Sequence, residues 1–385
     1  MIMNIGFFTD TYLPQVNGVV TSVESFRLGL EALGHQVFIF APKVRGYKDL
    51  AENKSKVFRF TSFRMNFMPS SGSNLANRLS LPFSLRAYLK LSDLKLDLVH
   101  SHTEFGMGQL ACFVAATYRI PHIHTYHTIY PEYVHYFAKG RMISSRAAEK
   151  LSAMYCNVCT AIVAPSERVK DLLWKYGVRK PVEIIGTGID YKEARSGNRQ
   201  AGRKKFNLGK DFVCAYVGRL GKEKSVEQAL RAFADLNFPN KRLLIVGDGP
   251  DKENLQELAQ KLGMADRAIF TGYLTRQEVM DAYAAADALC FSSRTETQGL
   301  VILEAEAAGL PIVAMDDPAI CEYVEDGKNG FLVNSVEEFT LALAKLASSE
   351  KLREQMGTAS QKIAKNFTHI SQSQKLLKVY EHVKL

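Results

Sequence analysis

Short runs of apolar residues alternate along the whole chain with stretches in which apolar residues recur every three or four positions. The short runs are typical of strands buried on both faces, and the periodic stretches are typical of amphipathic helices. The runs form two series: residues 3–8, 36–40, 96–100, 121–125 and 161–164, and then residues 213–217, 242–246, 268–270, 288–291 and 311–314. This alternation predicts an α/β protein with parallel sheets.

The two series predict two Rossmann-like domains. A chain of 385 residues is long enough for two separate cores. We expect the join near residues 185–190, which gives one domain over residues 1–187 and another over residues 188–366. The stretch 367–385 has the periodicity of an amphipathic helix.

Composition narrows the class of protein. A hydrophobic content of 46% and a charged content of 23% are typical of a soluble globular chain. The sequence contains no apolar run of about 18 residues, so we expect no membrane-spanning helix. Six cysteines are too few for a disulfide scaffold, and Cys156 and Cys159 have no second pair at metal-binding spacing.

Positive charge is concentrated in the first half. Residues 1–180 carry 22 Lys and Arg against 12 Asp and Glu, whereas the remaining residues carry 27 against 28. This asymmetry predicts an anionic partner, either a lipid surface or a nucleic acid. Within this half, residues 63–94 interleave apolar and basic positions. Such a segment could lie in the interface of an anionic membrane, or it could form a helix that packs on the domain.

Two acidic residues eight positions apart, Glu296 and Glu304, flank the start of a predicted helix over residues 299–309. A helix N-terminus exposes free backbone amides that attract anions and hydroxyl groups. Glu304 lies about 1.3 turns into the helix and should point toward the same crevice. Glu306, about 200° further round, should face solvent. The alternative is an exposed acidic loop beside a surface glutamate.

Two loops after predicted strands have features of phosphate-binding loops. Asn17 and Gly18 can form a positive-φ turn that lets the backbone approach a phosphate closely. Arg219 and Lys224 lie five positions apart, and an arginine fork with a lysine point charge suits a diphosphate. Lys222 between them should be solvated. A plain tight turn and a solvated basic loop are the alternatives.

Three further loops end strands at the carboxyl edge of a sheet, where ligands bind in α/β folds. Gly247-Asp248-Gly249-Pro250 and Thr271-Gly272-Tyr273-Leu274 belong to the second domain. His124-Thr125-Tyr126-His127-Thr128 belongs to the first. Taken singly, each segment is also compatible with an ordinary turn or a structural histidine.

Together these motifs resemble those of the retaining glycosyltransferases with the GT-B fold and the E-x7-E signature, as in glycosyltransferase family 4. Residues 218–224 match the pattern G-R-L-x-x-E-K of that family. The resemblance implies two Rossmann-like domains that face each other across a cleft, with the last helix returning to the first domain. It therefore assigns residues 367–385 to the acceptor-binding domain and residues 188–366 to the nucleotide-sugar donor-binding domain.

The resemblance also implies a set of donor-binding residues: Glu296, Gln298, Gly299 and Leu300 at the sugar, His127 at the same sugar, Glu304 at the ribose, Arg219 and Lys224 at the phosphates, Gly18 beneath the diphosphate, and Asp248 and Tyr273 at the base.

Two segments depart from the common pattern. Thr128 follows His127 where many relatives have aspartate, and residues 315–319 replace a Gly-Gly pair, so that loop receives no role.

A run rich in tyrosine and histidine at residues 127–140 suggests which acceptor the enzyme uses. This run, with residues 8–19, 103–105 and 296–299, resembles the bacterial 1,2-diacylglycerol 3-glucosyltransferases. The resemblance implies acceptor contacts from Tyr126, Tyr130, Tyr133, His135 and Tyr136.

The sequence thus predicts a retaining hexosyltransferase that moves glucose from UDP-glucose to 1,2-diacylglycerol and makes monoglucosyldiacylglycerol, a membrane glycolipid or lipoteichoic acid anchor. Retaining transfer of this kind needs no glycosidase-like acid pair. No Asp-x-Asp occupies a metal-binding position, so we expect no cofactor and no metal requirement. We expect a peripheral enzyme on the cytoplasmic face of the cell membrane, with a nucleotide sugar, diacylglycerol and an anionic membrane surface as partners, and no nucleic acid.

Three alternatives stay open. A GDP-mannose-dependent phosphatidylinositol mannosyltransferase, or another lipid glycosyltransferase, would share the fold. A nucleotide-sugar epimerase would convert the free UDP-sugar without an acceptor. A nucleic-acid-binding protein would use the basic first half, but the chain lacks a basic-aromatic RNP signature, and the second-domain motifs would be unexplained.

Overall fold

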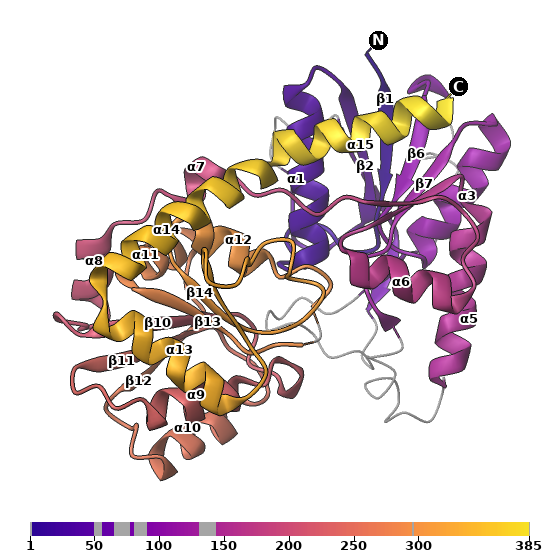
Figure 1. Ribbon diagram of the computed structural model, residues 1–385. Helices are drawn as coiled ribbons and strands as arrows, with labels where there is room; N and C mark the ends of the chain where they lie inside the picture. Colours follow the sequence, from indigo (N-terminus) through magenta and orange to yellow (C-terminus); the bar gives the residue numbers. More distant parts are fainter. Residues whose placement is uncertain are drawn as a thin grey trace. The chain divides into compact units, whose positions relative to one another are not determined.

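The computed structural model describes residues 2–49, 56–64, 78–80, 91–130, 144–294 and 296–384. The chain divides into two compact units, Met1–Gly188 with His369–Leu385, and Ile189–Thr368 (Figure 1). These boundaries lie within two residues of those expected from the apolar pattern. Each unit is an α/β fold built on a parallel sheet, so the predicted fold class is confirmed.

The first unit has the strand order β3-β2-β1-β6-β7-β8-β9, with parallel pairing throughout. The strands are β1 (Asn4–Phe8), β2 (Gln36–Pro42), β3 (Val57–Phe60), β6 (Leu98–Ser101), β7 (His122–Thr125), β8 (Ala161–Ala164) and β9 (Val182–Ile184). The helices are α1 (Gly18–Ala32), α3 (Gly106–Tyr118), α5 (Ser145–Val158), α6 (Glu167–Tyr176) and α15 (His369–Lys384). Strand alternation sends Phe7 into the cluster beneath α1 and α15, and Phe8 into the cluster beneath α3.

Helix α15 packs closely on α1 within the first unit (Figure 1). A Cβ added at Gly29 of α1 would lie 2.2 Å from Ser373 Oγ and 2.4 Å from the carbonyl oxygen of His369. Only glycine allows this approach of the two helices, because any side chain would overlap the backbone of α15. The last helix therefore belongs to the core of the first unit.

The second unit has the strand order β12-β11-β10-β13-β14-β15, also parallel. The strands are β10 (Phe212–Val217), β11 (Lys241–Val246), β12 (Ala268–Gly272), β13 (Ala288–Phe291), β14 (Ile312–Met315) and β15 (Gly330–Val333). The helices are α7 (Tyr191–Ala194), α8 (Arg199–Lys205), η4 (Lys222–Lys224), α9 (Val226–Asp235), α10 (Lys252–Lys261), α11 (Arg276–Ala285), α12 (Leu300–Ala307), α13 (Val336–Ser348), α14 (Glu350–Ala364) and η5 (Lys365–Phe367).

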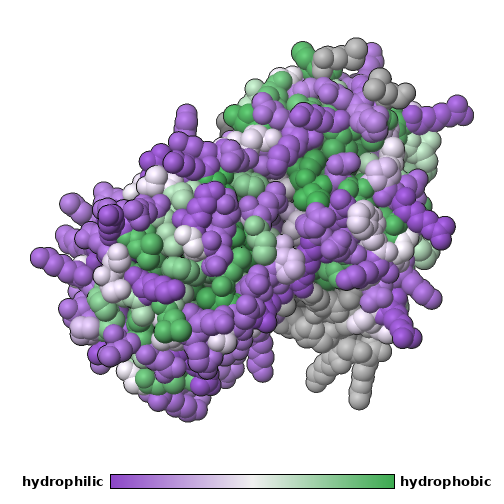
Figure 2. Space-filling view, viewed as in Figure 1, coloured by the Kyte–Doolittle hydropathy of each residue, from purple (hydrophilic) through white to green (hydrophobic). Residues whose placement is uncertain are grey.

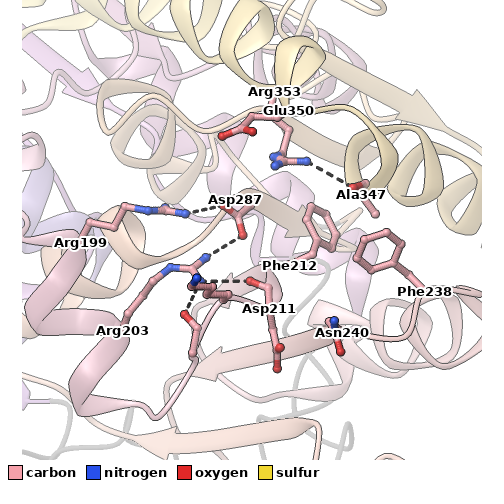
Figure 3. A pocket seen from close by; sticks show the side chains of 12 residues that line it. Arg199, Arg203, Asp211, Phe212, Phe238, Asn240, Asp287, Ala347, Glu350 and Arg353 are labelled. Carbon is pink, nitrogen blue, oxygen red and sulfur yellow. Dashed lines mark hydrogen bonds and ion pairs between the residues drawn. The ribbon is translucent and has the colours of Figure 1, made fainter.

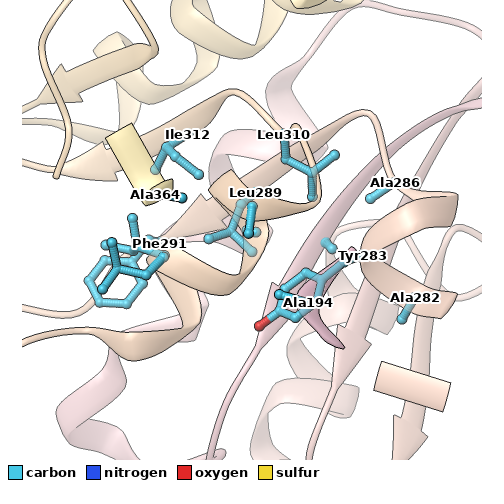
Figure 4. Close-up of a cluster of buried hydrophobic side chains, with 14 of the residues drawn as sticks. Ala194, Ala282, Tyr283, Ala286, Leu289, Phe291, Leu310, Ile312 and Ala364 are labelled. Atoms are coloured by element: carbon cyan, nitrogen blue, oxygen red, sulfur yellow. The ribbon is translucent and has the colours of Figure 1, made fainter. Parts of the chain in front are cut away.

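Two apolar clusters cover the two faces of this sheet. One includes residues of α11, α12 and the end of α14, such as Tyr283 and Ala364, packed against Leu289 and Ile312 (Figure 4). The other joins α9 and α13 to alternate residues of the same strands. Because both faces are covered, the strands read as continuous apolar runs, which is why their positions could be predicted from the sequence.

The basic stretch at residues 63–94 is described only in part. Strands β4 (Ser62–Arg64) and β5 (Arg78–Ser80) pair antiparallel as a two-stranded sheet, so these positions are strands and not part of a helix. Residues 65–77 and 81–90 lie outside the described residues. No helix in the described part of the chain is long and apolar enough to cross a membrane. Hydrophilic residues dominate the face shown in Figure 2, with smaller hydrophobic patches among them.

Candidate functional site

The loops at the carboxyl edge of the second sheet are joined through their backbones. The amide of Gly247 donates to the carbonyl of Gly272 at 3.1 Å, and the amide of Gly218 donates to the carbonyl of Val246 at 3.0 Å. A Cβ added at Gly247, which has a φ of +134°, would lie 1.9 Å from the Gly218 carbonyl oxygen. Glycine is therefore required there, and it brings the loops after β10, β11 and β12 together.

An ion pair connects two of the predicted donor-binding segments. Lys224, the last residue of η4, places Nζ 2.5 Å from Glu296 Oε1. The Ser292 hydroxyl also donates to the carbonyl of Lys224 at 3.1 Å. Both charged side chains are largely covered, with exposed fractions of 16% for Lys224 and 21% for Glu296. The sequence predicted both residues but gave no sign that they would contact each other.

Arg219 lies at the start of the same loop. Its Nη1 is 3.9 Å from Glu223 Oε1, and its carbonyl accepts a hydrogen bond from the Tyr216 hydroxyl at 3.1 Å. The guanidinium therefore keeps capacity for a further anion, because a contact of 3.9 Å is too long to be a hydrogen bond. Lys222, on the outer side of η4, is exposed, which confirms its expected position.

Asp248 and Tyr273 follow β11 and β12. Asp248 accepts from the amide of Gly249 at 2.8 Å and pairs with Lys252 Nζ at 2.9 Å. The hydrogen bond from Lys252 lowers the pKa of the Asp248 carboxyl, so this group stays ionised. Tyr273 has 60% of its surface exposed, which leaves its ring free to stack.

Helix α12 begins directly after Gly299, which has a φ of +79°. Gln298 just before it is buried. Glu304 is also buried, and its two carboxylate oxygens contact Arg276 Nη1 at 2.6 Å and the Tyr283 hydroxyl at 3.1 Å. Burial raises the pKa of Glu304, and Arg276 opposes that shift.

The prediction for Glu306 was wrong: this side chain is fully buried. Its Oε1 accepts from Asn329 Nδ2 at 2.8 Å, and burial raises its pKa well above the usual value. Asn329 also donates to the carbonyl of Tyr323 at 2.9 Å. The expectation failed because it assumed one exposed face for α12, whereas every residue from Ile302 to Ala307 is buried.

In the first unit, the prediction of a positive-φ turn at Asn17-Gly18 was also wrong. Asn17 has a φ of −160° and caps α1, because its side chain accepts from the amide of Val20 at 3.0 Å. Gly18 is the first residue of the helix, and a Cβ added there would meet no atom within 4 Å. The N-cap preference of asparagine outweighs its tolerance of left-handed backbone here. The open space above Gly18 still allows close approach of a ligand to the helix N-terminus.

Asp10 ties the loop after β1 to the start of α3. Its carboxylate accepts from the Thr103 hydroxyl at 2.8 Å and from the amide of Met107 at 3.1 Å. Its own amide donates to Thr103 Oγ1 at 2.8 Å. This buried carboxylate therefore supplies a partner to a free amide at a helix N-terminus and orders the loop between β1 and α1.

Five histidines cluster on β6, on β7 and in the loops that follow these two strands. His127 Nε2 lies 3.0 Å from His102 Nδ1. His100 contacts the Tyr380 hydroxyl at 2.5 Å, and Ser101 Oγ lies 2.8 Å from His122 Nε2 and 2.9 Å from His124 Nδ1. Sequence reasoning found His127 and considered His124, but it missed the other three. The pattern His-x-His occurs at two of the predicted strands, and this repetition could have indicated the cluster.

Burial favours the neutral form of four of these rings. It lowers the pKa values of His122 and His127 to about 3, and the neighbouring His124 contributes to both shifts. Burial also lowers the pKa values of His100 and His102 well below the usual value. His100, His102, His122 and His127 can therefore act as neutral hydrogen-bonding groups at ordinary pH.

The predicted acceptor residues differ in burial, and some of them are not described by the structure. Tyr126 is fully buried and its hydroxyl lies 2.9 Å from Ser152 Oγ, so it is a core residue in this structure rather than a surface contact. Tyr130 is partly buried and donates to Glu104 Oε2. Tyr133, His135 and Tyr136 lie outside the described residues.

The cysteine pair is structural in character. Cys156 and Cys159 are buried free thiols, and burial raises the pKa of both. Cys159 Sγ lies 3.7 Å from His122 Nδ1. No group of three or more potential metal ligands occurs within the described ranges.

A pocket of about 480 Å³ lies at the opposite edge of the second sheet, near the amino ends of β10, β11 and β13 (Figure 3). Its guanidinium groups already have protein partners. Arg199 and Arg203 both pair with Asp287, at 2.7 and 2.9 Å, and Arg353 donates to the carbonyl of Leu346 at 2.6 Å. These contacts brace the base of the sheet, and the pocket is remote from the loops described above.

Comparison with known proteins identifies related sequences. Residues 198–363 match the family model described as Glycosyl transferases group 1, and residues 16–193 match Glycosyltransferase Family 4. The alpha-monoglucosyldiacylglycerol synthase of Acholeplasma laidlawii is 36% identical, over 93% of this chain and 91% of its own length. The enzyme of that name from Streptococcus pneumoniae is 35% identical, over 86% of this chain and 75% of its own. A GDP-mannose-dependent alpha-mannosyltransferase of Corynebacterium glutamicum is 28% identical, over 87% of this chain and 78% of its own.

Solved structures share the fold at low identity. Anabaena HepE in complex with UDP has a TM-score of 0.79 and 20% identity, covering 99% of this chain and 100% of that one. The sucrose-phosphate synthase of Thermosynechococcus elongatus has a TM-score of 0.76 and 18% identity, covering 98% of each chain. These structures support the fold assignment alone.

Proposed function

The chain belongs to the glycosyltransferase family that includes the alpha-monoglucosyldiacylglycerol synthases, and from this membership we propose that it transfers glucose from UDP-glucose to 1,2-diacylglycerol with retention at the anomeric carbon. The product is monoglucosyldiacylglycerol. The observation that carries the proposal is the similarity to the Acholeplasma synthase, because it extends over both units. The donor loops of the second unit then suggest how the transfer proceeds.

In this proposal, Arg219 and Lys224 neutralise the diphosphate of the donor. A diphosphate carries concentrated negative charge, and a guanidinium with a neighbouring ammonium is suited to it. Arg219 has only a long contact to Glu223, so its donors can turn to phosphate oxygens. Lys224 pairs with Glu296, which keeps an ammonium near the diphosphate and a carboxylate acceptor near the sugar.

The remaining donor contacts follow the same loops. Gln298, Gly299 and Leu300 precede or begin α12, where free amides favour sugar hydroxyls and phosphate oxygens. Asp248 and the exposed ring of Tyr273 are suited to hydrogen bonding and stacking with the base. Glu304 is assigned to the ribose, and Gly18 to close backbone approach at the diphosphate.

The chemical step exchanges one bond at the anomeric carbon for another on the same face. The bond from the anomeric carbon to the β-phosphate oxygen breaks, and a bond to the acceptor oxygen forms. The proton of the acceptor hydroxyl goes to the departing phosphate oxygen, so no protein acid is needed. Preorganised charge from Arg219, Lys224 and the helix amides stabilises the leaving diphosphate. His127 contacts the sugar as a neutral ring, since its pKa is lowered to about 3.

We further propose that the enzyme acts at an anionic membrane surface on the cytoplasmic face, attracted by the basic first half of the chain, and that transfer requires no divalent ion. Residues 1–180 include 22 basic and 12 acidic residues, and this positive surplus supports attraction to anionic lipid. Diacylglycerol resides in the bilayer, so an enzyme that uses it must reach the surface.

The test is transfer of radiolabel into diacylglycerol in anionic vesicles, with UDP-glucose, UDP-galactose and GDP-mannose compared. We expect lipid labelling from UDP-glucose, no loss with a chelator, and loss in Glu296→Ala. The matched control is Glu257→Ala, which removes a glutamate that is 67% exposed on α10. Labelling from GDP-mannose instead would favour the mannosyltransferase alternative, and labelling of only a soluble acceptor would reject diacylglycerol.

A further inference from the structure

The guanidinium of Arg276 is shared between two carboxylates on different elements. Arg276 is the first residue of α11, just after the cap residue Thr275. Its Nη1 lies 2.6 Å from Glu304 Oε1 on α12, and its Nη2 lies 2.9 Å from Glu193 Oε2 on α7. The contact to Glu193 fixes one side of the guanidinium plane, and the other side is thereby aimed at Glu304.

Glu304 is unusual among the acids of this edge because it is buried. About 10% of its side chain is exposed, compared with 21% for Glu296. Burial raises the pKa of Glu304, while Arg276 and the Tyr283 hydroxyl oppose the shift and Glu193 adds to it. Without Arg276, this carboxyl would be more readily protonated.

The two protein partners leave acceptor capacity on Glu304. An ionised carboxylate has about four lone-pair sites, and Arg276 and Tyr283 use two of them. The two that are left match the two hydroxyl donors of a ribose diol. A protonated carboxyl would lose part of this capacity and would present a donor of its own.

We propose that Arg276 and Tyr283 are positioning residues for ribose recognition, which hold Glu304 ionised and oriented so that it accepts both ribose hydroxyls of the nucleotide. This inference rests on the proposed function, because Glu304 is assigned to the ribose there. Neither residue needs to touch the nucleotide. Their effect should be confined to ligands that carry the diol.

The experiment compares the binding of UDP and 2′,3′-dideoxy-UDP by calorimetry. We expect Arg276→Gln to weaken UDP binding by about tenfold to a hundredfold, as for loss of hydrogen bonds to a charged group. The affinity for 2′,3′-dideoxy-UDP should change by less than about twofold, because this ligand makes no contact that Glu304 could lose. Arg276→Lys should restore part of the UDP affinity, since the charge is kept.

Tyr283→Phe provides a second variant that preserves the buried ring. It should weaken UDP binding by about tenfold and leave the dideoxy ligand unaffected. The matched control is Arg242→Gln, which breaks an arginine–carboxylate pair to Asp211 of 2.8 Å at the other edge of the same sheet. It should leave both affinities unchanged.

A pH series supplies an independent readout. UDP binding should fall as Glu304 becomes protonated, and Arg276→Gln should move this loss to higher pH. Equal losses for UDP and 2′,3′-dideoxy-UDP would overturn the positioning role while leaving the donor assignment intact. Absence of UDP binding to the unaltered protein would overturn the proposed donor and this inference with it.

Discussion

In the first unit, five histidines cluster on β6, on β7 and in the loops that follow these strands. His100, His122 and His124 contact serine, threonine or tyrosine hydroxyls, and His102 contacts His127. In the second unit, the loops after β10 to β13 and the helices that follow them carry ion pairs: Lys224 with Glu296, Asp248 with Lys252, and Arg276 with Glu304. Both edges belong to parallel sheets with helices on both faces. The same architecture therefore supports two different kinds of electrostatic environment.

The two edges differ in how their buried side chains avoid an unpaired charge. The histidines of the first unit can lose their charge at small cost, since a neutral imidazole is accessible near neutral pH. Arginine and lysine cannot, so they are held near carboxylates. We infer that the charged edge suits an anionic diphosphate, whereas the neutral edge suits the uncharged hydroxyl groups of a sugar or an alcohol.

The largest expected effect is the loss of stability of the first unit at acidic pH. Unfolded histidines take up protons below about pH 6.5, whereas His122 and His127 in the folded state do not until about pH 3. The unfolded state thus binds more protons in this window, so stability is full above about pH 6.5 and falls as the pH drops. The loss is about 1.4 kcal/mol per pH unit for each such histidine.

Urea unfolding followed by fluorescence measures this loss in the first unit. The chain has a single tryptophan, Trp174, on α6 of that unit. His122→Gln should flatten the dependence on pH, whereas His382→Gln, at an exposed position on α15, should leave it unchanged. A midpoint that does not move between pH 6.5 and pH 5 would show that the buried histidines are already protonated.

Removal of one cation should weaken the charged edge by the next largest amount. Lys224→Ala should lower kcat/KM for transfer by about a hundredfold to a thousandfold, as for loss of one group that stabilises developing charge. Lys224→Arg should retain much of the activity. Steady-state kinetics with UDP-glucose test this. Lys222→Ala is the matched control on the same short helix, and an equal loss there would mean that only net charge matters.

A smaller effect is expected for the neutral edge. His127→Ala should lower kcat/KM by about tenfold, because one neutral hydrogen bond to the sugar is lost. The ratio to the unaltered enzyme should stay constant between pH 6 and pH 8, since the ring does not titrate in that range. A ratio that changes with pH would indicate a charged or proton-transferring His127.

The last change concerns Glu306, a buried acid whose carboxyl contacts the neutral amide of Asn329. Glu306 stays protonated because burial raises its pKa, so its contribution to stability decreases as the pH rises. Glu306→Gln should therefore gain stability relative to the unaltered protein as the pH rises from 5 to 8, by up to about 1.4 kcal/mol per pH unit while Glu306 of the folded state stays protonated. Thermal melting at the two pH values measures the gain. Equal differences at both would show that Glu306 is ionised.

Much of the framework could be predicted from apolar runs, because strands covered on both faces have continuous hydrophobic sequences. The short edge strands β9 and β15 were missed, since Val182–Ile184 and Gly330–Val333 offer little periodicity. The loops proposed to bind the donor were singled out because glycine and charged residues follow strand ends. Their mutual contacts were not, because Lys224 and Glu296 are 72 residues apart and no local pattern links them.

The failures have a common physical origin. The helical period shows which residues share a face of a helix, but it does not show how many faces are buried. Glu306 was therefore expected to face solvent, although all sides of α12 from Ile302 to Ala307 are buried. Asn17 could form a turn or a cap, and the helix that follows decided for the cap. The histidine cluster was hidden because its members come from two strands whose adjacency is a property of the sheet order.

Because α15 is synthesised last, the first unit cannot complete its core until the end of translation. Its Tyr380 hydroxyl contacts His100, 280 residues earlier in the chain. The second unit, Ile189–Thr368, leaves the ribosome before α15 does. The second unit can therefore fold while the first unit still lacks its last helix. During that interval, the apolar face of α1 that later covers Leu376 and Tyr380 is bare, so the nascent first unit is the part that a chaperone would have to protect.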